Sequence, residues 1–339
     1  MKKIILILMT LCLFACSSKE KELSTSEKLT ELGYSENSIS KIEIYTEDLQ
    51  QLFLETYNEK YDELLNYEDF DINNLEEYLT NYDYFEDEQL IQVVNSGRIK
   101  ELESNEYYIP CLKALYLRYL DEYDSIRDLI EIVNTYRYLP LYTCIMETDV
   151  SKNYLMLVNK YHQLPSDYEP DDLVDIDSDY GWGSTRQAVY DAFVKMADDA
   201  YEAGHTISIT SAYRSYDYQD GLYNKYLSID EGGQASVDTY SARPGHSEHQ
   251  SGLCLDLVTP GYSMDDFGLS KASAWVDENC YKYGFIIRYT EDKVNITGYQ
   301  AEPWQIRYVG SSEIAKDIKD RGISFDEYYR VFVDNEEYK

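Results

Sequence analysis

Glycine is distributed unevenly along the 339 residues, and this contrast divides the chain into two regions. Residues 26–150 are acidic, rich in Tyr and Leu and nearly free of glycine, and their apolar residues recur at helical spacing. After residue 151, glycine and tryptophan become common, and helical patterns alternate with strand-like ones. The contrast predicts a helical bundle over residues 26–150 and a second domain over residues 151–339.

Local patterns give the second domain its fold class. An apolar helical stripe over residues 189–200 is closed by Gly204, and Ile207 and Ile209 then alternate with polar neighbours as in a half-buried strand. Short strands mixed with helices, without regular βαβ spacing, predict an α+β domain.

In the first domain, Ser125 and Asp128 form a capping-box start. A short Val-Asn match recurs at 94–95, 133–134 and 158–159, which is too little to predict a solenoid.

The N-terminus has the features of an export signal. Lys2 and Lys3 precede an apolar run over residues 4–11, and the run ends at Ala15 and Cys16. This is too short for a membrane span and is typical of a secretion signal over residues 1–15. Cys16 after Ala15 resembles a lipobox, which predicts lipidation of Cys16, a polar tether over 16–25 and a location at the outer face of the bacterial cytoplasmic membrane. A simply cleaved signal is the alternative.

The net charge limits which partners the chain can bind, and the cysteine content limits which disulfides it can form. A formal charge of -34 excludes nucleic acid as a partner, because phosphate binding needs clustered Lys and Arg. Four cysteines lie beyond the signal, in a compartment where disulfides persist. Chain order favours Cys111 with Cys144 and Cys254 with Cys280. Four cysteines allow three pairings, and free thiols are the alternative.

The densest group of chemically active residues is RPGHSEHQSGLCLDL, over residues 243–257. His249 and Asp256 lie seven residues apart, and Gly252 between them permits a tight turn that could aim both side chains at one point. Imidazole and carboxylate are both good zinc ligands. By itself this spacing is weak evidence, because a histidine near an aspartate is more often a structural hydrogen bond.

Three motifs in order resemble a known family. SAYRSYDYQ (211–219), RPGHSEHQSGLCLD (243–256) and TGYQAEPWQIRYVG (297–310) are similar to motifs of the zinc D-alanyl-D-alanine carboxypeptidases of the vancomycin-resistance type, which trim peptidoglycan stem peptides. The likeness runs from about residue 154 to residue 328. It implies the D,D-peptidase fold, a small antiparallel sheet flanked by helices, and a stem peptide ending in D-alanine as the substrate.

The resemblance also assigns roles to single residues. It makes His249 and Asp256 zinc ligands, Glu302 the general base, and Arg214 the cation at the substrate carbonyl. Such a site is chemically sound, because zinc with an open position lowers the pKa of its water to about 7 and a nearby carboxylate accepts the proton. The remaining positions that match the family are expected to contact substrate, namely Tyr213, Gln219, Ser247 and Trp304.

One position departs from the family pattern. The third ligand in the family is a histidine, and EPWQ places Gln305 there. A neutral amide oxygen is a poor zinc ligand beside imidazole, so we expect one zinc ion, bound weakly or not at all. His246 is a less favoured substitute ligand. The chain is therefore expected to be a cell-wall carboxypeptidase; the alternative is an impaired relative that binds peptidoglycan peptides, or an envelope partner of the N-terminal bundle, without hydrolysis.

The same resemblance bears on two of the cysteines. Cys254 and Cys280 stand where members of the family usually have small residues, and two small positions changed together favour a disulfide between them. A bridge enclosing about 26 residues would stabilise the fold by roughly 3 to 4 kcal/mol in the chain-entropy account.

Overall fold

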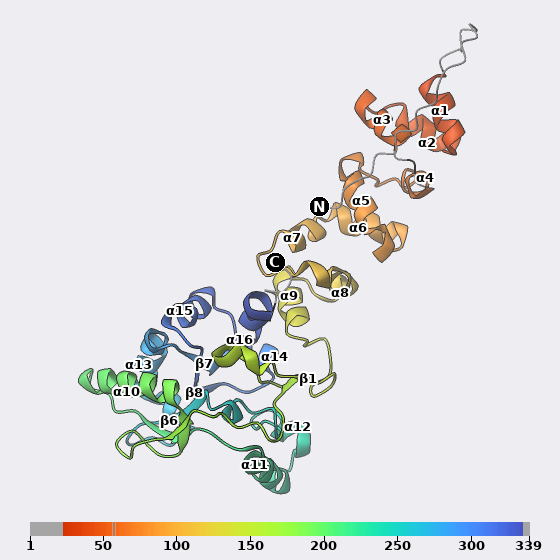
Figure 1. Cartoon of the computed structure of the whole chain (residues 1–339). Coiled ribbons are helices and arrows are strands. Elements are labelled where there is room, and N and C mark those ends of the chain that lie inside the picture. The colour runs from red at the N-terminus through yellow and green to blue at the C-terminus, as the bar shows by residue number, and fades with distance from the viewer. Residues whose placement is uncertain (1–22, 56, 58, 335–339) are drawn as a thin grey trace, which may run out of the picture. The chain divides into compact units, whose positions relative to one another are not determined.

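The computed structural model describes residues 23–55, 57 and 59–334, which fall into two compact units. The first unit ends at Ile99 and the second begins at Lys100, and each is described by itself (Figure 1). The predicted signal over residues 1–15 and the predicted lipidation site Cys16 lie outside the described residues. Among the described residues, none of the helices is both long and apolar enough to cross a bilayer.

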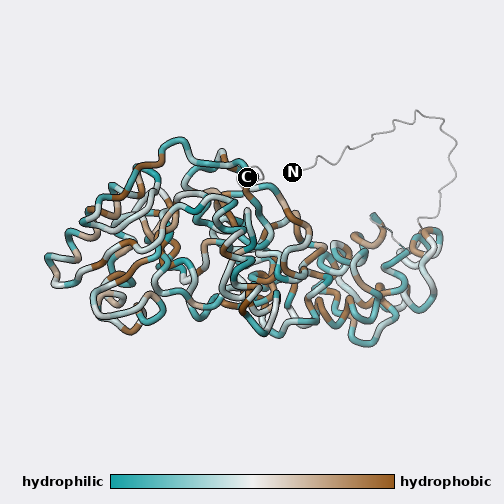
Figure 2. The backbone as a smooth tube through the Cα atoms, turned by 90° about the horizontal axis from the view of Figure 1, so that it is seen from below, coloured by the Kyte–Doolittle hydropathy of each residue, from teal (hydrophilic) through white to brown (hydrophobic). Residues whose placement is uncertain are grey.

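The first unit is built from short helices around a small aromatic and aliphatic core. Its first helix begins with a capping box, in which Ser24 and Glu27 form reciprocal hydrogen bonds between side chain and backbone. Brown apolar stretches alternate with teal polar ones along this unit in Figure 2, as expected of amphipathic helices. Buried Leu29, Ile42 and Phe53 lie at the centre of its core. The helices are α1 (Thr25–Leu32), α2 (Glu36–Ile42), α3 (Glu47–Glu55), α4 (Glu59–Leu64), α5 (Leu75–Asn81) and α6 (Asp87–Asn95), with α7 (Arg98–Glu103) at the boundary.

The second unit is an α+β domain, as predicted. Its main sheet is antiparallel with strand order β5-β6-β8-β7. The strands are β5 (Ser208–Ser211), β6 (Cys254–Val258), β7 (Phe285–Tyr289) and β8 (Glu302–Tyr308). Two small sheets pair β1 (Met146–Glu147) with β2 (His162–Gln163) and β3 (Leu173–Asp175) with β4 (Ser184–Arg186). The helices are α8 (Lys113–Tyr119), α9 (Ile126–Asn134), α10 (Gln187–Glu202), α11 (Tyr216–Ile229), α12 (Gly233–Val237), α13 (Lys271–Asn279), α14 (Val294–Thr297), α15 (Ser312–Arg321) and α16 (Phe325–Tyr328).

The two faces of the main sheet have different chemistry. Leu255 and Leu257 of β6 and Ile306 of β8 face a core that α10 and α13 complete. Alternate residues of a strand point to opposite faces, so Cys254 and Asp256 lie on the other, polar face. Helix α10 and strand β5 coincide with the predicted helical stripe and strand. The sheet thus separates an apolar core from the face that carries the site residues.

The boundary between the units lies earlier than the predicted one between residues 150 and 151. Helix α9 begins at its predicted cap Ser125, but it belongs to the second unit. Within that unit, Lys293 Nζ lies 3.4 Å from Glu131 Oε1, and Arg137 Nε donates to the Asn295 carbonyl at 2.6 Å. These polar contacts bind residues 100–150 to the rest of the second unit, although their composition resembles that of the first.

The recurring Val-Asn match has a structural counterpart at two of its three positions. In the first unit, Tyr78 Oη donates to Asn95 Oδ1 at 2.5 Å, and the Asp71 amide donates to Tyr78 Oη at 3.2 Å. In the second unit, Tyr116 and Asn134 repeat the arrangement. Both asparagines also donate to a carbonyl of the preceding turn. The two helix pairs α5–α6 and α8–α9 therefore share one local hydrogen-bond motif.

Candidate active site

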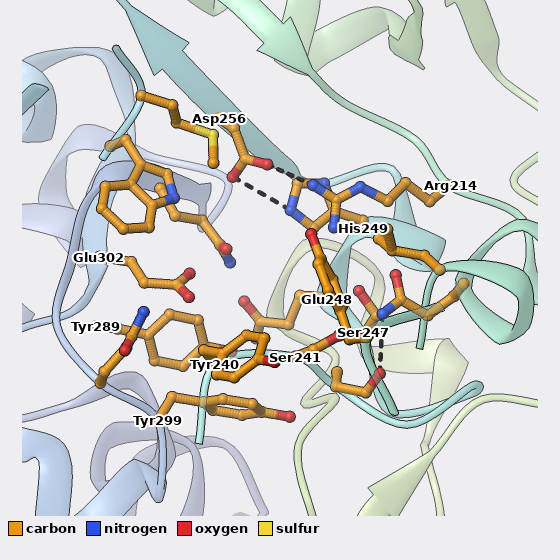
Figure 3. A pocket seen from close by; sticks show the side chains of 18 of the residues that line it. Arg214, Tyr240, Ser241, Ser247, Glu248, His249, Asp256, Tyr289, Tyr299 and Glu302 are labelled. Carbon is orange, nitrogen blue, oxygen red and sulfur yellow. Dashed lines mark hydrogen bonds and ion pairs between the residues drawn. The ribbon is translucent and has the colours of Figure 1, made fainter. Parts of the chain in front are cut away.

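The site lies on the polar face of the main sheet, in a cavity of about 160 Å³. Asp256 of β6 is the direct cross-strand partner of Gln305 on β8, and Glu302 begins β8. His249 comes from the short 3-10 turn Glu248–Ser251 that precedes β6. In Figure 3 the side chains of Asp256, His249 and Glu302 surround one central space. The structure therefore brings the three predicted residues together.

Gly252 makes the turn between His249 and Asp256 possible. Its φ is +68°, in the left-handed region, and it caps the 3-10 turn before β6 begins. A Cβ at this position would lie 2.9 Å from Arg186 Cγ, so a side chain has neither the backbone freedom nor the space. The reversal predicted from this glycine is present.

His249 and Asp256 are buried and held in defined orientations. His249 Nδ1 lies 2.6 Å from the Ala212 carbonyl oxygen, which can only accept, so Nδ1 carries a proton and Nε2 is the nitrogen that faces Asp256. Nε2 is 3.3 Å from Asp256 Oδ1. Arg214 Nη2 binds Oδ2 at 2.5 Å, whereas Oδ1 has no hydrogen-bond donor among the described residues. In the tautomer protonated only at Nδ1, the Nε2 lone pair and Asp256 Oδ1 would face each other, and a cation between them could satisfy both.

The carboxyl groups of the site differ in their preferred protonation state. Burial raises the pKa of Asp256, but the interactions with His249 and Arg214 outweigh it and hold the net pKa below its usual value, which favours the carboxylate form. Burial, followed by the charge of Asp256, raises the pKa of Glu302 to about 8. A carboxyl group with a raised pKa beside an ionised one is the arrangement expected of a proton-transferring residue and a ligand.

The remaining histidines are structural. His246, the substitute ligand considered above, has Nδ1 2.7 Å from the Asn159 carbonyl, and its ring packs edge-on against Tyr142. His162 contacts Asn159, and His205 lies near the ring of Trp275. None of the three lines the cavity. Within the described ranges, no group of three or more His, Cys, Asp and Glu side chains could hold a metal ion.

The residues expected to contact substrate divide into two groups. Gln219, Ser247 and Trp304 line the cavity together with Arg214. Gln219 is held by a bond from its amide nitrogen to the Ala242 carbonyl at 2.8 Å. Tyr213 does not line the cavity, although it adjoins Arg214 in the chain, because its side chain lies near Glu169 and Tyr168. Its assignment to the substrate site is not supported by this geometry.

Comparison with known proteins matches this part of the chain. The model of the family VanY, D-alanyl-D-alanine carboxypeptidase, matches residues 183–311. The putative carboxypeptidase YodJ of Bacillus subtilis (strain 168) is 40% identical over 187 residues, which cover 52% of this chain and 67% of that protein. The chain belongs to the VanY family of D-alanyl-D-alanine carboxypeptidases. The resemblance inferred from the three motifs is confirmed.

Solved structures agree with the family assignment. The LdcB LD-carboxypeptidase superposes with a TM-score of 0.52 at 36% identity, covering 56% of this chain and 91% of that one. A vancomycin-resistance D,D-pentapeptidase, VanY, solved in complex with Zn(II), is 30% identical, with a TM-score of 0.46 and coverage of 52% of this chain and 98% of that one. The superposition with LdcB, together with the family match, confirms the predicted fold of the C-terminal domain for this VanY-family chain.

The disulfide predicted between Cys254 and Cys280 is absent, and both are buried free thiols. Cys280 packs in the apolar core on the α10 and α13 side of the sheet. Cys254 points to the opposite face, where its Sγ lies 3.1 Å from Glu248 Oε2. The sheet itself separates the two sulfur atoms. Cys111 and Cys144 are likewise free, and both are exposed.

Several cavity residues of this VanY-family chain were not anticipated from the sequence. Tyr240, Tyr289 and Tyr299 form an aromatic edge of the cavity (Figure 3), and no spacing rule distinguishes them among 37 tyrosines. Lys160 lies under this edge, with Nζ 3.4 Å from the centre of the Tyr299 ring. Glu248, inside the second motif, is fully buried between Arg288 and Arg307. Its place between Ser247 and His249 was a usable signal, but its arginine partners are far away in sequence.

Proposed function

We propose that this chain is a zinc-dependent carboxypeptidase that removes the terminal D-alanine from peptidoglycan stem peptides. The observation that carries the proposal is the convergence of His249, Asp256 and Glu302 on one cavity. Family membership gives the reaction class, and the alternative of binding without hydrolysis is not favoured by the relatives.

The donor atoms fit a metal ion. In the tautomer protonated only at Nδ1, His249 Nε2 would offer a lone pair, and the buried Asp256 Oδ1 has no donor among the described groups, so a cation would satisfy both. His249 and Asp256 would hold zinc, with Gln305 as the third candidate ligand. The bound ion would supply Lewis-acid activation of a water molecule.

Glu302 is the candidate proton acceptor. Its carboxyl group is 8% exposed and lines the cavity with the two ligands. A cation held by His249 and Asp256 would favour its ionised form before reaction, because a nearby positive charge lowers a carboxyl pKa. Once the charge balance changes, burial and the neighbouring Asp256 hold the accepted proton on Glu302. The same side chain could then deliver it to the leaving amine.

Arg214 and the polar wall bind and orient the peptide. Arg214 is tied to Ser211 through Nε at 2.9 Å and to Asp256 through Nη2, so its guanidinium is fixed at the cavity edge. From there it can donate to the carbonyl oxygen of the scissile bond, where negative charge develops. Ser247 and Gln219 supply further polar contacts for the substrate.

The N-terminal sequence features support a location of the proposed activity outside the cell. We propose that the signal over residues 1–15 exports the chain and that Cys16 is lipidated, which tethers it to the outer face of the cytoplasmic membrane. An envelope protein is the proposed partner of the N-terminal helices. We expect a fatty-acid analogue to label the wild-type protein and not the Cys16→Ser variant. Unchanged labelling in that variant would contradict it.

The hydrolase proposal is tested with purified protein, zinc and a stem pentapeptide ending in D-Ala-D-Ala. Released D-alanine is measured in wild type, in Glu302→Gln and after chelation, and the last two are expected to be inactive. A tetrapeptide whose last bond joins an L residue to D-alanine distinguishes the two bond specificities found among the relatives. If only Gln305→His releases D-alanine, the natural protein is not a hydrolase.

A further inference from the structure

We infer that Cys254 orients the side-chain amide of Gln305 so that the amide oxygen faces His249 and Asp256 and serves as a third, neutral metal ligand. Cys254 is thereby a positioning residue and not itself a ligand. The inference rests on the metal site of the proposed function and names what completes it in this chain.

Strand register places the three side chains on one face. Asp256 pairs with Gln305 across β6 and β8, and Cys254 pairs with Arg307 two residues away on both strands. Directly opposed residues of an antiparallel pair have Cβ atoms about 4.5–5.5 Å apart, and diagonal neighbours are within reach of long side chains. Gln305 therefore extends between Asp256, its direct partner, and Cys254, its diagonal neighbour.

Glu248 determines which way the Cys254 thiol points its hydrogen. The Glu248 carboxylate is fully buried and is paired with Arg288 Nε at 2.9 Å and Arg307 Nη1 at 2.8 Å. Both of its oxygens face guanidinium groups, which can only donate, so they act as hydrogen-bond acceptors. Cys254 Sγ lies 3.1 Å from Glu248 Oε2, so the thiol must donate its hydrogen to this carboxylate.

The orientation of the Gln305 amide follows from that donation. With its hydrogen given to Glu248, the sulfur offers only a lone pair to its other neighbour, which is Gln305 at 3.6 Å. A lone pair attracts the amide nitrogen and repels the amide oxygen. Nε2 of Gln305 accordingly faces Cys254, and Oε1 is directed to the other side of the amide.

The cavity side completes a donor set. Gln305, His249 and Asp256 all line the cavity, where His249 Nε2 lies 3.3 Å from Asp256 Oδ1 and this oxygen has no hydrogen-bond donor among the described residues. An amide oxygen adds a third electron-rich atom, whereas a flipped amide would add N–H groups that bond to Asp256 and leave no place for a cation. The Cys254–Gln305 bond therefore distinguishes a metal-binding site from a hydrogen-bonded, metal-free one.

The test measures zinc affinity by competition with a chromophoric chelator and does not depend on turnover. Cys254→Ala removes the acceptor and frees the amide, so we expect zinc affinity about 10- to 100-fold weaker than in wild type, the usual effect of losing a group that orients a ligand. Cys254→Ser keeps a hydroxyl that donates to Glu248 and accepts from Gln305, so it should retain affinity within a few-fold. Gln305→Leu should lose affinity at least as strongly as Cys254→Ala.

Cys280→Ala is the matched control, because it truncates the other buried thiol on the apolar side of the same sheet. This variant should leave zinc affinity unchanged, even if it lowers the free energy of unfolding. X-ray absorption of the zinc-loaded protein should show nitrogen and oxygen neighbours only; sulfur at about 2.3 Å, the Zn–S bond length, would make Cys254 a ligand and overturn the inference.

The outcomes separate this inference from the proposed function. Zinc binding that follows the predicted variant order, without release of D-alanine, would refute the hydrolase and leave the orienting role intact. Equal affinity in wild type, Cys254→Ala and Gln305→Leu would refute the orienting role even if the enzyme is active. Absence of zinc binding in wild type would also overturn it, because the amide oxygen would then have no metal to face.

Discussion

The substitution Glu248→Gln tests whether the buried charges behind the site are balanced as the structure indicates. Glu248, Arg288 and Arg307 have fully buried side chains, and Asp326 is 4% exposed. Two guanidinium groups therefore face two carboxylates, and the cluster is neutral. The nitrogens of Arg288 lie 2.9 Å from Glu248 and 2.7 Å from Asp326 but make no well-aligned hydrogen bond, so its contacts with the two carboxyl groups are mainly electrostatic. The near-isosteric amide keeps the volume of Glu248 and removes its charge.

The expected loss follows from leaving one positive charge buried without compensation. Breaking a buried ion pair by removing one partner costs about 3–5 kcal/mol. Arg288 keeps its ion pair with Asp326, and Arg307 keeps its bonds to the carbonyls of Tyr154 and Met156, so the lower half of this range is expected. With a urea m-value of about 2–3 kcal/mol/M, the unfolding midpoint should fall by about 1–2 M.

Tryptophan fluorescence is a selective probe for this experiment, because Trp182, Trp275 and Trp304 all lie in the second unit. Lys316→Gln provides the control, since it removes one charge from the exposed pair with Asp320 and should shift the midpoint only slightly. A Glu248→Gln midpoint within the error of the Lys316→Gln midpoint would refute the charge assignment of the cluster.

Three further outcomes are expected. Glu302→Gln should lower kcat for D-alanine release by about 10²–10⁴-fold, the usual range for a general base, while bound zinc is retained; a smaller loss would remove Glu302 from that role. Because the folded protein raises the pKa of Glu302 from 4.5 to about 8, its contribution to the stability of the metal-free protein is complete below pH 4.5 and is lost as the pH rises through about 8. The difference in unfolding free energy between wild type and Glu302→Gln should follow that window in chelator, and a flat difference would contradict it. Iodoacetamide should modify Cys111 and Cys144 in the folded protein but Cys254 and Cys280 only after unfolding, and a mass corresponding to a Cys254–Cys280 bridge would contradict the free thiols.

The sequence patterns correctly predicted the elements whose structure depends on residues close together in the chain. The stripe over residues 189–200 gave α10, the alternation at Ile207 and Ile209 gave β5, and Gly252 gave the turn into β6. Each depends on periodicity or on one residue's backbone freedom, which the sequence displays directly. The three motifs correctly predicted that His249, Asp256 and Glu302 meet at one cavity, because the resemblance to a family carries information on tertiary structure.

What the sequence did not reveal depends on contacts between distant segments. The ion pairs of Glu248 join three segments that lie far apart in the sequence. The boundary at Lys100 reflects the spatial contacts of residues 100–150 with the rest of the second unit and not their composition. The disulfide error was avoidable. Once Asp256 is assigned to the site, strand alternation puts Cys254 on the same face, and a core cysteine such as Cys280 cannot reach it through the sheet.

The same alternation explains why Cys254 and Gln305 are best considered as a pair. A histidine at position 305 would be a strong metal ligand, oriented by a hydrogen bond from its other ring nitrogen. The glutamine side chain offers only a weak ligand, its amide oxygen. Its amide nitrogen can reach the same place by rotation of the amide group and would repel a cation there. Glutamine is thus compatible with a metal only where a neighbour occupies its nitrogen, and Cys254 Sγ lies where that neighbour is needed. Because Glu248 fixes the polarity of the thiol, the buried arginines behind it also bear on the metal site, and Glu248→Gln should weaken zinc binding together with stability.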